Sequence, residues 1–377
     1  MSNNQDNNRK IRVGITQGDT NGIGYEIILK TLSNNAMLEL CQPIIYGSSR
    51  ILTYHRKALE MPAFQIHYTR DINNLKDNVP NLFEACRDEV KVELGQPDKQ
   101  AGKAAFDALE AAVQHLKQGK IDVLVTAPIS KENIQSNEFQ FPGHTEYLEA
   151  SLGTGEKALM ILCAEQLRVA LVSIHKPIAD VPQAVTRETV LSTIMQFNES
   201  LKRDFACQGP RIAVLSLNPH AGEHGLLGKE EQEQIIPAIQ EATENKVLCF
   251  GPYAADGFFG SKLYTHFDGV VAMYHDQGLA PFKALSMDSG VNFTAGLPYV
   301  RTSPDHGTGY DIVGQGIAHE DSLRQAIFTA IDIYRHRKTY DENHANPLRK
   351  QYFERGKDNV VLDLTKDDDD PTDPILT

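Results

Sequence analysis

Short apolar segments alternate with amphipathic helical segments in the first third of the chain, and this alternation restricts the fold more than any other feature. The apolar segments have the length of strands, and they are Ile11–Gln17, Pro43–Tyr46, Phe64–Tyr68 and Ile121–Val125. Helices are predicted between them at Ile23–Leu32, Ser49–Leu59 and Gly102–Lys117. Strands separated by helices are typical of βαβ units, so the sequence predicts an α/β fold with a mainly parallel sheet.

The same alternation continues after a predicted hairpin. Two apolar runs, Ala158–Cys163 and Arg168–Ile174, are separated by a short polar turn and are expected to pair. The later strands are predicted at Arg211–Leu217, Val247–Phe250 and Val270–Met273. The later helices are predicted at Arg187–Arg203, Lys229–Glu244 and Ser322–Arg337, where apolar residues recur at helical spacing.

The net charge and the cysteine content limit the partners and the cellular compartment that we expect for this chain. With 37 Lys and Arg against 50 Asp and Glu, the formal net charge is −13. We therefore expect no nucleic-acid or membrane-surface partner, because anionic partners need positive surfaces. No apolar run approaches the roughly 20 residues of a membrane span, and residues 1–10 are too polar for a signal peptide. The five cysteines are scattered without a CxxC pair, which favours reduced thiols and a cytoplasmic protein.

Three histidines directly follow apolar strands. His175, His220 and His275 end the segments LVSIH, VLSLNPH and VVAMYH. Since the carboxyl ends of parallel strands line the ligand crevice of an α/β sheet, these imidazoles are expected to converge there. Three neutral imidazoles suit Zn²⁺ or a similar divalent ion with one position open for substrate. The alternative is three unrelated loop histidines.

Two aspartates accompany these histidines. Asp276 follows His275 at once, and Asp256 precedes an apolar GFFG segment. A metal-bound imidazole usually needs an acceptor for its other ring nitrogen, and both aspartates are candidates. The alternative for an aspartate that follows a strand is a helix N-cap.

Glycine-rich and basic segments indicate a ligand with phosphate groups. The turn at Gly18–Gly24 lies between a strand and a helix but matches neither the dinucleotide fingerprint nor a Walker motif. The segment Gly143–Glu146 is typical of a helix start. Lys283, Asn292 and Arg301 recur across strand-like segments and form a possible phosphate clamp, the alternative being solvated surface residues. The polar, glycine-rich Thr302–Gly316 is interpreted as a binding loop.

Seven motifs in order resemble the 4-hydroxythreonine-4-phosphate dehydrogenases, the PdxA family. They are GDTNGIGYE, VTAPISK, FPGHTEYL, SIHKPIADVP, LNPHAGEHGLLGKEE, AMYHDQGLAPFKAL and GLPYVRTSPDHGTGYDI, and the resemblance covers about Ile11 to Tyr334. The sequence departs from the usual motifs at Thr20, Asn21 and Tyr25, at Ser216, at Gly309, Tyr310 and Val313, and in ADGFFGSK, 255–262. None of these changes removes an expected ligand.

The resemblance implies an isocitrate/isopropylmalate-dehydrogenase-like α/β fold with two α/β/α domains and the active cleft between them. The first domain, on the nucleotide side, is expected at residues 11–142 with 303–340. The second, with the metal, substrate and dimer contacts, is expected at 143–302. Residues 1–10 are expected to be a disordered arm, and 341–377 a solvated acidic tail. The resemblance also implies a homodimer whose active sites use residues of both subunits.

The family's functional residues carry over onto matching positions. The resemblance implies metal ligands at His175, His220 and His275 and supporting catalytic aspartates at Asp256 and Asp276. It implies substrate-binding residues at the positions His144, Thr145, Lys283, Asn292 and Arg301. The cofactor, NAD or NADP, is expected against His306, Gly307 and Asp311. The metal is expected to be Zn²⁺, with Co²⁺, Mn²⁺ or Mg²⁺ as alternatives.

The activity that this resemblance implies is oxidation and decarboxylation of 4-phosphooxy-L-threonine to 3-amino-2-oxopropyl phosphate, in pyridoxal 5'-phosphate (vitamin B6) biosynthesis. One alternative is a paralogue that oxidises 4-phospho-D-threonate or 4-phospho-D-erythronate. A second is a cis-dihydrodiol dehydrogenase, which has no phosphate to hold, so Lys283, Asn292 and Arg301 argue against it. A third is a metabolite-binding protein without turnover.

Overall fold

The structure is a computed structural model that describes residues 9–86, 90–155, 157–286 and 289–346. The chain divides into two compact units, Met1–Tyr340 and Asp341–Thr377, and every strand of the sheet belongs to the first unit. The predicted tail lies outside the described residues from position 347 onward. Within the described ranges, no helix combines the length and the apolar character that crossing a bilayer requires.

A single twelve-stranded sheet forms the centre of this unit, in the order β3-β4-β2-β1-β5-β12-β11-β6-β7-β10-β8-β9. The strands are β1 (Ile11–Thr16), β2 (Cys41–Gly47), β3 (His67–Thr69), β4 (Asn81–Glu84), β5 (Val123–Thr126), β6 (Leu159–Ala164), β7 (Leu167–Leu171), β8 (Arg211–Leu215), β9 (Leu248–Tyr253), β10 (Gly269–Ala272), β11 (Val291–Ala295) and β12 (Val300–Pro304). Neighbouring strands are parallel, apart from the antiparallel pairs β6·β7, β6·β11 and β11·β12. The predicted α/β class, parallel sheet and hairpin are confirmed.

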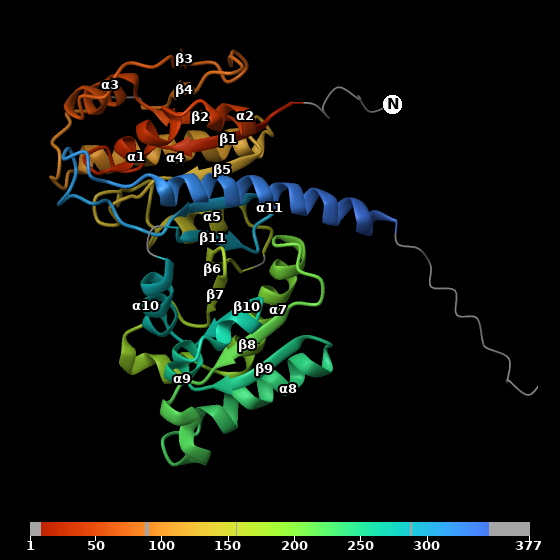
Figure 1. Ribbon diagram of the computed structural model, residues 1–377. Helices are drawn as coiled ribbons and strands as arrows, with labels where there is room; N and C mark the ends of the chain where they lie inside the picture. Colours follow the sequence, from red (N-terminus) through yellow and green to blue (C-terminus); the bar gives the residue numbers. More distant parts are fainter. Residues whose placement is uncertain (1–8, 87–89, 156, 287–288, 347–377) are drawn as a thin grey trace, which may run out of the picture. The chain divides into compact units, whose positions relative to one another are not determined.

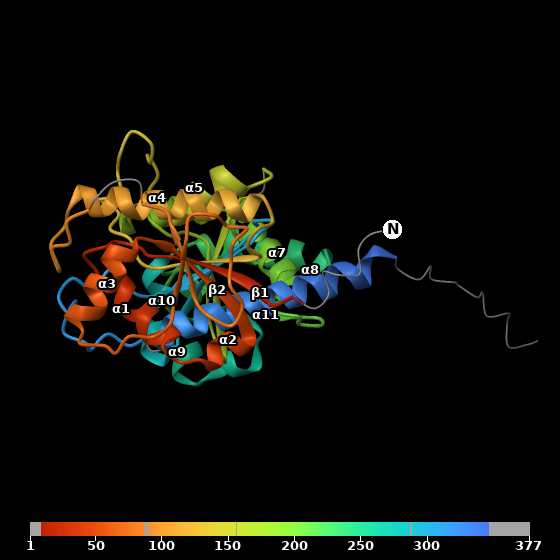
Figure 2. The ribbon, with the colours of Figure 1, turned by 90° about the horizontal axis from the view of Figure 1, so that it is seen from above.

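Helices cover both faces of the sheet (Figure 1). They are α1 (Gly24–Leu32), α2 (Ala36–Leu40), α3 (Ser49–Ala58), α4 (Lys99–Lys117), α5 (His144–Leu152), α6 (Val181–Ala184), α7 (Arg187–Arg203), α8 (Ile236–Glu244), α9 (Ala255–Gly260), α10 (His275–Ser286) and α11 (Asp321–Ala345). Figure 2 shows α4 and α5 on the opposite side of β1 and β2 from α1 and α3.

The side-chain alternation of the strands explains this layering. In β5, Val123 and Val125 join the core that contains α1 and α11, whereas Leu124 joins the core that contains α4. In β7, Val169 packs with residues of α9 and α10, and its neighbour Ala170 packs with residues of α7 and α8. Successive side chains of a strand point to opposite faces, so apolar strands of this kind need helices on both sides.

The sequence prediction differs from the structure at several boundaries. The strand expected at Phe64–Tyr68 is displaced to β3, and β4 was not predicted because its four residues, NLFE, give no clear alternation. The strand-like segments around Asn292 and Arg301 are β11 and β12. The last helix continues beyond Arg337 to Ala345.

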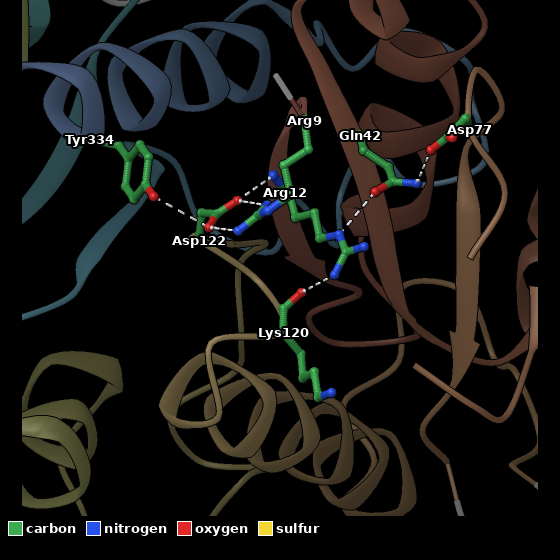
Figure 3. Close-up of polar contacts among 7 residues, drawn as sticks. All are labelled: Arg9, Arg12, Gln42, Asp77, Lys120, Asp122 and Tyr334. Carbon is green, nitrogen blue, oxygen red and sulfur yellow. Dashed lines mark hydrogen bonds and ion pairs between the residues drawn. The ribbon is translucent and has the colours of Figure 1, made fainter. Parts of the chain in front are cut away.

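A polar cluster anchors the start of β1 (Figure 3). The carboxylate of Asp122 accepts hydrogen bonds from both terminal nitrogens of Arg9, at 2.6 and 2.7 Å, and from the backbone N–H of Arg12, at 2.8 Å. The Tyr334 hydroxyl of α11 donates to the same carboxylate at 3.4 Å. Arg9 and Lys10 are therefore held in place, which corrects the last two residues of the predicted disordered arm; Lys10 donates to the Leu38 carbonyl oxygen. Residues 1–8 lie outside the described residues.

The order of the strands places the central ones between two groups of opposite direction. Strands β7, β10 and β8 are parallel to one another and end at one edge of the sheet, whereas β5 and β12 end at the opposite edge, because three antiparallel pairs separate β12 from β7. Strand β11 runs antiparallel to β12 and pairs Asn292 with Ser303, so its first residues lie at the edge where β12 ends. Ligand sites in α/β sheets are found outside the carboxyl ends of the strands, and here both groups of strand ends adjoin the central strands.

Candidate active site

A cavity of about 330 Å³ opens over the central strands of the sheet, where Met160 of β6, Asn292 of β11 and Arg301 of β12 line it. Most of the residues singled out from the sequence line it: His144, Thr145, His175, His275, Lys283, Asn292, Arg301, His306 and Gly307. They come from α5, the loop after β7, α10, β11, β12 and the loop after β12. The volume lies within the range of small-molecule sites.

Arg301 forms the buried end of the cavity. Its side chain is only 2% exposed, and its Nε and Nη2 donate to the Thr126 hydroxyl at 3.1 and 2.6 Å. Its Nη1 donates to the Thr294 hydroxyl at 3.1 Å. Burial lowers the pKa of Arg301 to about 10. The described residues give this guanidinium no ion pair, so the geometry favours an anionic ligand as its partner.

Three buried polar atoms around the cavity have no hydrogen-bond partner among the described residues. They are His144 Nε2, Asn292 Oδ1 and His306 Nε2. Burial, followed by the charges of Arg301 and Lys131, holds the pKa of His144 well below its usual value. Burial also lowers the pKa of His306. Buried polar atoms are normally paired, so these three indicate where a bound ligand completes the hydrogen bonding.

Lys283 and Asp305 lie together at the other side of the cavity. The Lys283 Nζ donates to the Asp305 carbonyl oxygen at 3.2 Å and lies 3.8 Å from its Oδ2. Burial raises the pKa of the Asp305 carboxyl, although the Lys283 charge opposes this. Sequence analysis did not assign a role to Asp305, yet its place directly after β12, in the predicted binding loop, is the signal that marks it.

Lys131 is a second residue that sequence analysis missed. It lies in the loop after β5, within the VTAPISK segment, and its Nζ lies 3.4 Å from His175 Nε2. Its position a few residues beyond a strand end is the same signal that marked the histidines. With Arg301 and Lys283, Lys131 gives the cavity lining three basic side chains against two acidic ones, Glu146 and Asp305, in a chain whose net charge is −13.

His175 and His275 form the histidine pair of the cavity. Their ring centroids are 6.3 Å apart, because β7 and β10 are neighbours in the sheet. The Nδ1 of His275 lies 2.6 Å from Asp276 Oδ1, and since a carboxylate only accepts, the imidazole donates this hydrogen bond. The Nε2 lone pair then remains available to a metal. Partial desolvation of the ring and the Lys131 charge lower the pKa of His175, which favours its neutral form. This donor set fits a divalent metal such as zinc.

Four predicted site residues are not in the cavity lining: Asp276, which instead accepts from His275, and three others. His220 follows β8 in the 3-10 segment η3 (Pro219–Gly225), where its backbone is left-handed and its side chain is exposed. Asp256 is exposed on α9, and Asp311 is exposed in the loop after β12. Across the described residues, no three histidine, cysteine or acidic side chains form a metal-binding group. One chain therefore does not bring His220 to the pair of His175 and His275.

The glycine-rich turn after β1 packs against the loop after β12. The backbone N–H of Ile23 donates to the Thr308 carbonyl oxygen at 2.9 Å, and the Tyr310 hydroxyl donates to Asp19 Oδ2 at 2.8 Å. A Cβ at Gly22 would lie 2.6 Å from the same Thr308 oxygen, so glycine permits this close approach. Burial raises the pKa of Asp19. The turn thus supports the loop that carries His306.

The fold and the cavity define a class: an α/β protein with a basic site over the central strands of its sheet and a histidine pair beside it. The family model described as "Pyridoxal phosphate biosynthetic protein PdxA" matches residues 39–330. A 4-hydroxythreonine-4-phosphate dehydrogenase of Bacteroides thetaiotaomicron is 58% identical over 362 residues, which cover 96% of this chain and 99% of the relative. The chain belongs to the PdxA family.

Two further relatives show how the family varies. A putative D-threonate 4-phosphate dehydrogenase of Oceanobacillus iheyensis is 39% identical, with 86% of this chain and 98% of the relative covered. The solved 4-hydroxythreonine-4-phosphate dehydrogenase of Klebsiella pneumoniae is 32% identical, covers 87% of this chain and 99% of its own, and superposes with a TM-score of 0.76. The α/β fold expected from the resemblance is thereby confirmed as that of the solved PdxA structures.

Proposed function

We propose that this protein is a 4-hydroxythreonine-4-phosphate dehydrogenase, which oxidises and decarboxylates 4-phosphooxy-L-threonine to 3-amino-2-oxopropyl phosphate for pyridoxal 5'-phosphate synthesis. The observation that carries the proposal is the buried Arg301 guanidinium, which lies without an ion pair among the described residues. A phosphorylated hydroxy acid supplies the missing anion. The family supports this substrate, since the relative of 58% identity bears this name.

The chain's own residues would bind and orient the substrate. Arg301 and Lys283 supply charge-assisted donors to its phosphate and carboxylate groups, and Asn292 Oδ1 accepts from a substrate donor. His144 is neutral because its pKa is lowered, so its free Nε2 serves as a hydrogen-bond partner rather than as a fixed charge. This arrangement supplies orientation, which lowers the barrier by holding reacting groups in place.

The metal and the dinucleotide would complete the chemistry. His175, His275 and a third histidine would hold the metal, which lowers the pKa of the substrate hydroxyl when it is bound. A bound NAD or NADP would supply the hydride acceptor for the carbon that bears this hydroxyl, a base would take the hydroxyl proton, and the β-keto acid so formed would lose CO₂. His306 and Gly307 line the cavity where the nicotinamide side is expected, and Asp311 lies further along their loop.

The third histidine would come from a second copy of the chain. His220 is exposed and stands outside the cavity that contains His175 and His275, which supports a homodimer with shared sites. Asp256, also exposed, would act from the same side as His220. The five scattered cysteines support a cytoplasmic enzyme.

The test is NAD(P)H formation from 4-phosphooxy-L-threonine, compared with 4-phospho-D-threonate and 4-phospho-D-erythronate. Each substrate is assayed before and after chelation and after Zn²⁺ is restored. We expect turnover of the L-threonine derivative that chelation abolishes and zinc restores. Turnover of one of the D-acids alone would show that this D-acid, and not the L-threonine derivative, is the substrate. Absence of turnover with all three compounds would overturn the proposal.

A further inference from the structure

The chain after β8 makes a left-handed helical turn. Five consecutive residues, His220–His224, have φ between 43° and 77°. Four of them carry a Cβ, which disfavours this conformation, and left-handed residues normally occur singly. Such a run persists only where surrounding contacts enforce it. His220 is its first residue, so whatever enforces the turn also determines where this imidazole points.

One buried carboxylate holds the entrance of the turn. Glu231 is 1% exposed, and its Oε1 accepts the backbone N–H groups of Leu217 and Asn218, each at 2.8 Å. Its Oε2 accepts from the Asn218 side-chain nitrogen at 3.0 Å. Three hydrogen bonds converge on this carboxylate from the two residues that precede Pro219, so the strand exit has one fixed direction.

The centre of the turn rests on the same carboxylate. A Cβ at Gly222, where φ is 77°, would lie 2.5 Å from Glu231 Oε2. The glycine therefore lets the backbone of the turn pass directly over the carboxylate. Glu231 contacts both the strand exit and the middle of the turn, and His220 lies between these two points.

The side chain of Gln277 connects the end of β8 to the end of β10, the strand that His275 follows. The Gln277 amide nitrogen donates to the Ser216 carbonyl oxygen at 2.6 Å, and its amide oxygen accepts the Met273 N–H at 2.7 Å. The ends of β8 and β10 are thereby joined through one side chain. The base of the His220 turn is fixed relative to the sheet, which leaves the turn itself to set the direction of the imidazole.

We propose that Glu231 is the positioning residue for His220 in metal binding. The inference rests on the proposed function, which assigns His220 as a metal ligand. Glu231 holds the strand exit and supports the left-handed turn, so His220 is presented in one orientation before metal arrives. Ligands that are fixed in advance bind metal more tightly than ligands that must be ordered on binding.

The first experiment measures the Zn²⁺ affinity of the full-length protein by competition with a chromophoric chelator. In Glu231→Gln, the side-chain amide cannot accept from the Asn218 nitrogen, so the turn loosens. We expect Zn²⁺ affinity to fall about 10- to 100-fold, the range for residues that support ligands. The matched control is Glu233→Gln, a residue exposed in the same segment, η4 (Glu231–Ile235), with unchanged affinity expected.

The second experiment repeats Glu231→Gln in a His220→Ala background. If Glu231 acts through His220, it has no further effect on Zn²⁺ affinity there. Equal weakening in both backgrounds would show a general structural role and overturn the inference. If His220→Ala alone leaves affinity unchanged, the metal assignment in the proposed function fails, whatever Glu231 does. Should Glu231→Gln fail to fold, the same comparison is made with Asn218→Ala, which removes one contact of the Glu231 carboxylate together with the 2.7 Å hydrogen bond to Glu230.

Discussion

The cationic side and the histidine side of the cavity are built in opposite ways. Arg301 and Asn292 lie on strands within the sheet, and the guanidinium is held by Thr126 and Thr294. His175 and His275 lie just beyond the strand ends, where His175 is exposed and His275 half-exposed. The proposed anion site is therefore complete within one chain, whereas the proposed metal site has only two of its three histidines there.

The largest effect on activity is expected from variants that each remove one histidine of the proposed metal site. His220→Ala and His275→Ala are each expected to abolish chelation-sensitive turnover. Mixed and reassociated, they should recover about a quarter of wild-type activity, because half of the dimers are mixed and each has one intact site. NAD(P)H formation by the mixture measures this recovery.

The control for this experiment comes from the geometry of the cavity. His175 and His275 lie in the same chain, at a centroid separation of 6.3 Å, so a mixture of His175→Ala and His275→Ala should recover nothing. His224→Ala, in the same left-handed turn as His220, should behave like wild type. Recovery by the His175 and His275 pair would contradict the proposed division.

Arg301→Met should separate the two sides of the cavity. Removing a buried, charge-assisted partner is expected to cost roughly 2–5 kcal/mol of transition-state binding free energy, which lowers kcat/KM about 30- to 4000-fold. Zn²⁺ affinity should stay unchanged, because Arg301 contacts Thr126 and Thr294 and neither histidine. Steady-state kinetics and chelator competition measure the two quantities on the same sample. A parallel loss of metal affinity would show that the two sides are one unit.

The ligand-free protein should also respond to Arg301→Met. A buried guanidinium with no ion pair in the described chain is costly, so its replacement by an apolar side chain of similar length should raise the Tm. Inorganic phosphate should stabilise the wild type and leave the variant unaffected. A lower Tm in the variant would show that the hydrogen bonds to the threonines outweigh the cost of burying the charge.

The pH dependence of stability should follow the buried imidazole of His144. Its pKa is lower in the folded than in the unfolded protein, so below pH 6.5 the unfolded state binds more protons. The free energy of unfolding should therefore fall as pH falls below 6.5, and His144→Asn should reduce this slope. Urea unfolding at pH 7.5 and 5.5 measures it. An unchanged slope in the variant would show that other groups, such as the similarly shifted His55, carry the effect.

The sequence predicted the pair of histidines but not the separation of the third. His175 and His275 follow β7 and β10, which are neighbours, so strand-end reasoning applies to both. His220 follows β8, which also neighbours β10, and the same reasoning placed it with them. The left-handed turn redirects it, and four of its five residues are not glycine, so no local signal marks the turn. Tertiary contacts from Glu231 enforce a conformation that local preferences oppose.

The charged residues of the cavity were also predicted only in part from the sequence. Lys283, Asn292 and Arg301 were recognised from spacing and resemblance, and the structure brings all three to one cavity. Lys131 and Asp305 were not assigned, although they also lie in strand-end loops. A sequence shows which residues follow strands, but which of them reach the cavity depends on strand order, and only the structure supplies that.

The weakest effect is expected at the turn that supports the loop after β12. Tyr310→Phe removes the donor to Asp19 Oδ2 and the hydroxyl that accepts from Asn133 Nδ2 at 3.0 Å. Asn133 Nδ2, at 3.3 Å, remains as a side-chain donor to the Asp19 oxygen. A lost hydrogen bond of this kind costs about 1 kcal/mol, so we expect a small fall in Tm and a few-fold rise in the KM for the dinucleotide. Substrate KM and Zn²⁺ affinity should not change.

Thermal unfolding and initial rates at varied NAD(P) concentrations check this prediction. Tyr54→Phe, an exposed tyrosine on α3 whose ring lies edge-on to His55, is the matched control and should change neither quantity. If Tyr310→Phe raised the substrate KM instead, the loop after β12 would belong to the anion side of the cavity. The anion side, which is proposed to be complete within one chain, would then include this loop, and the comparison with the metal side would have to be redrawn to include it.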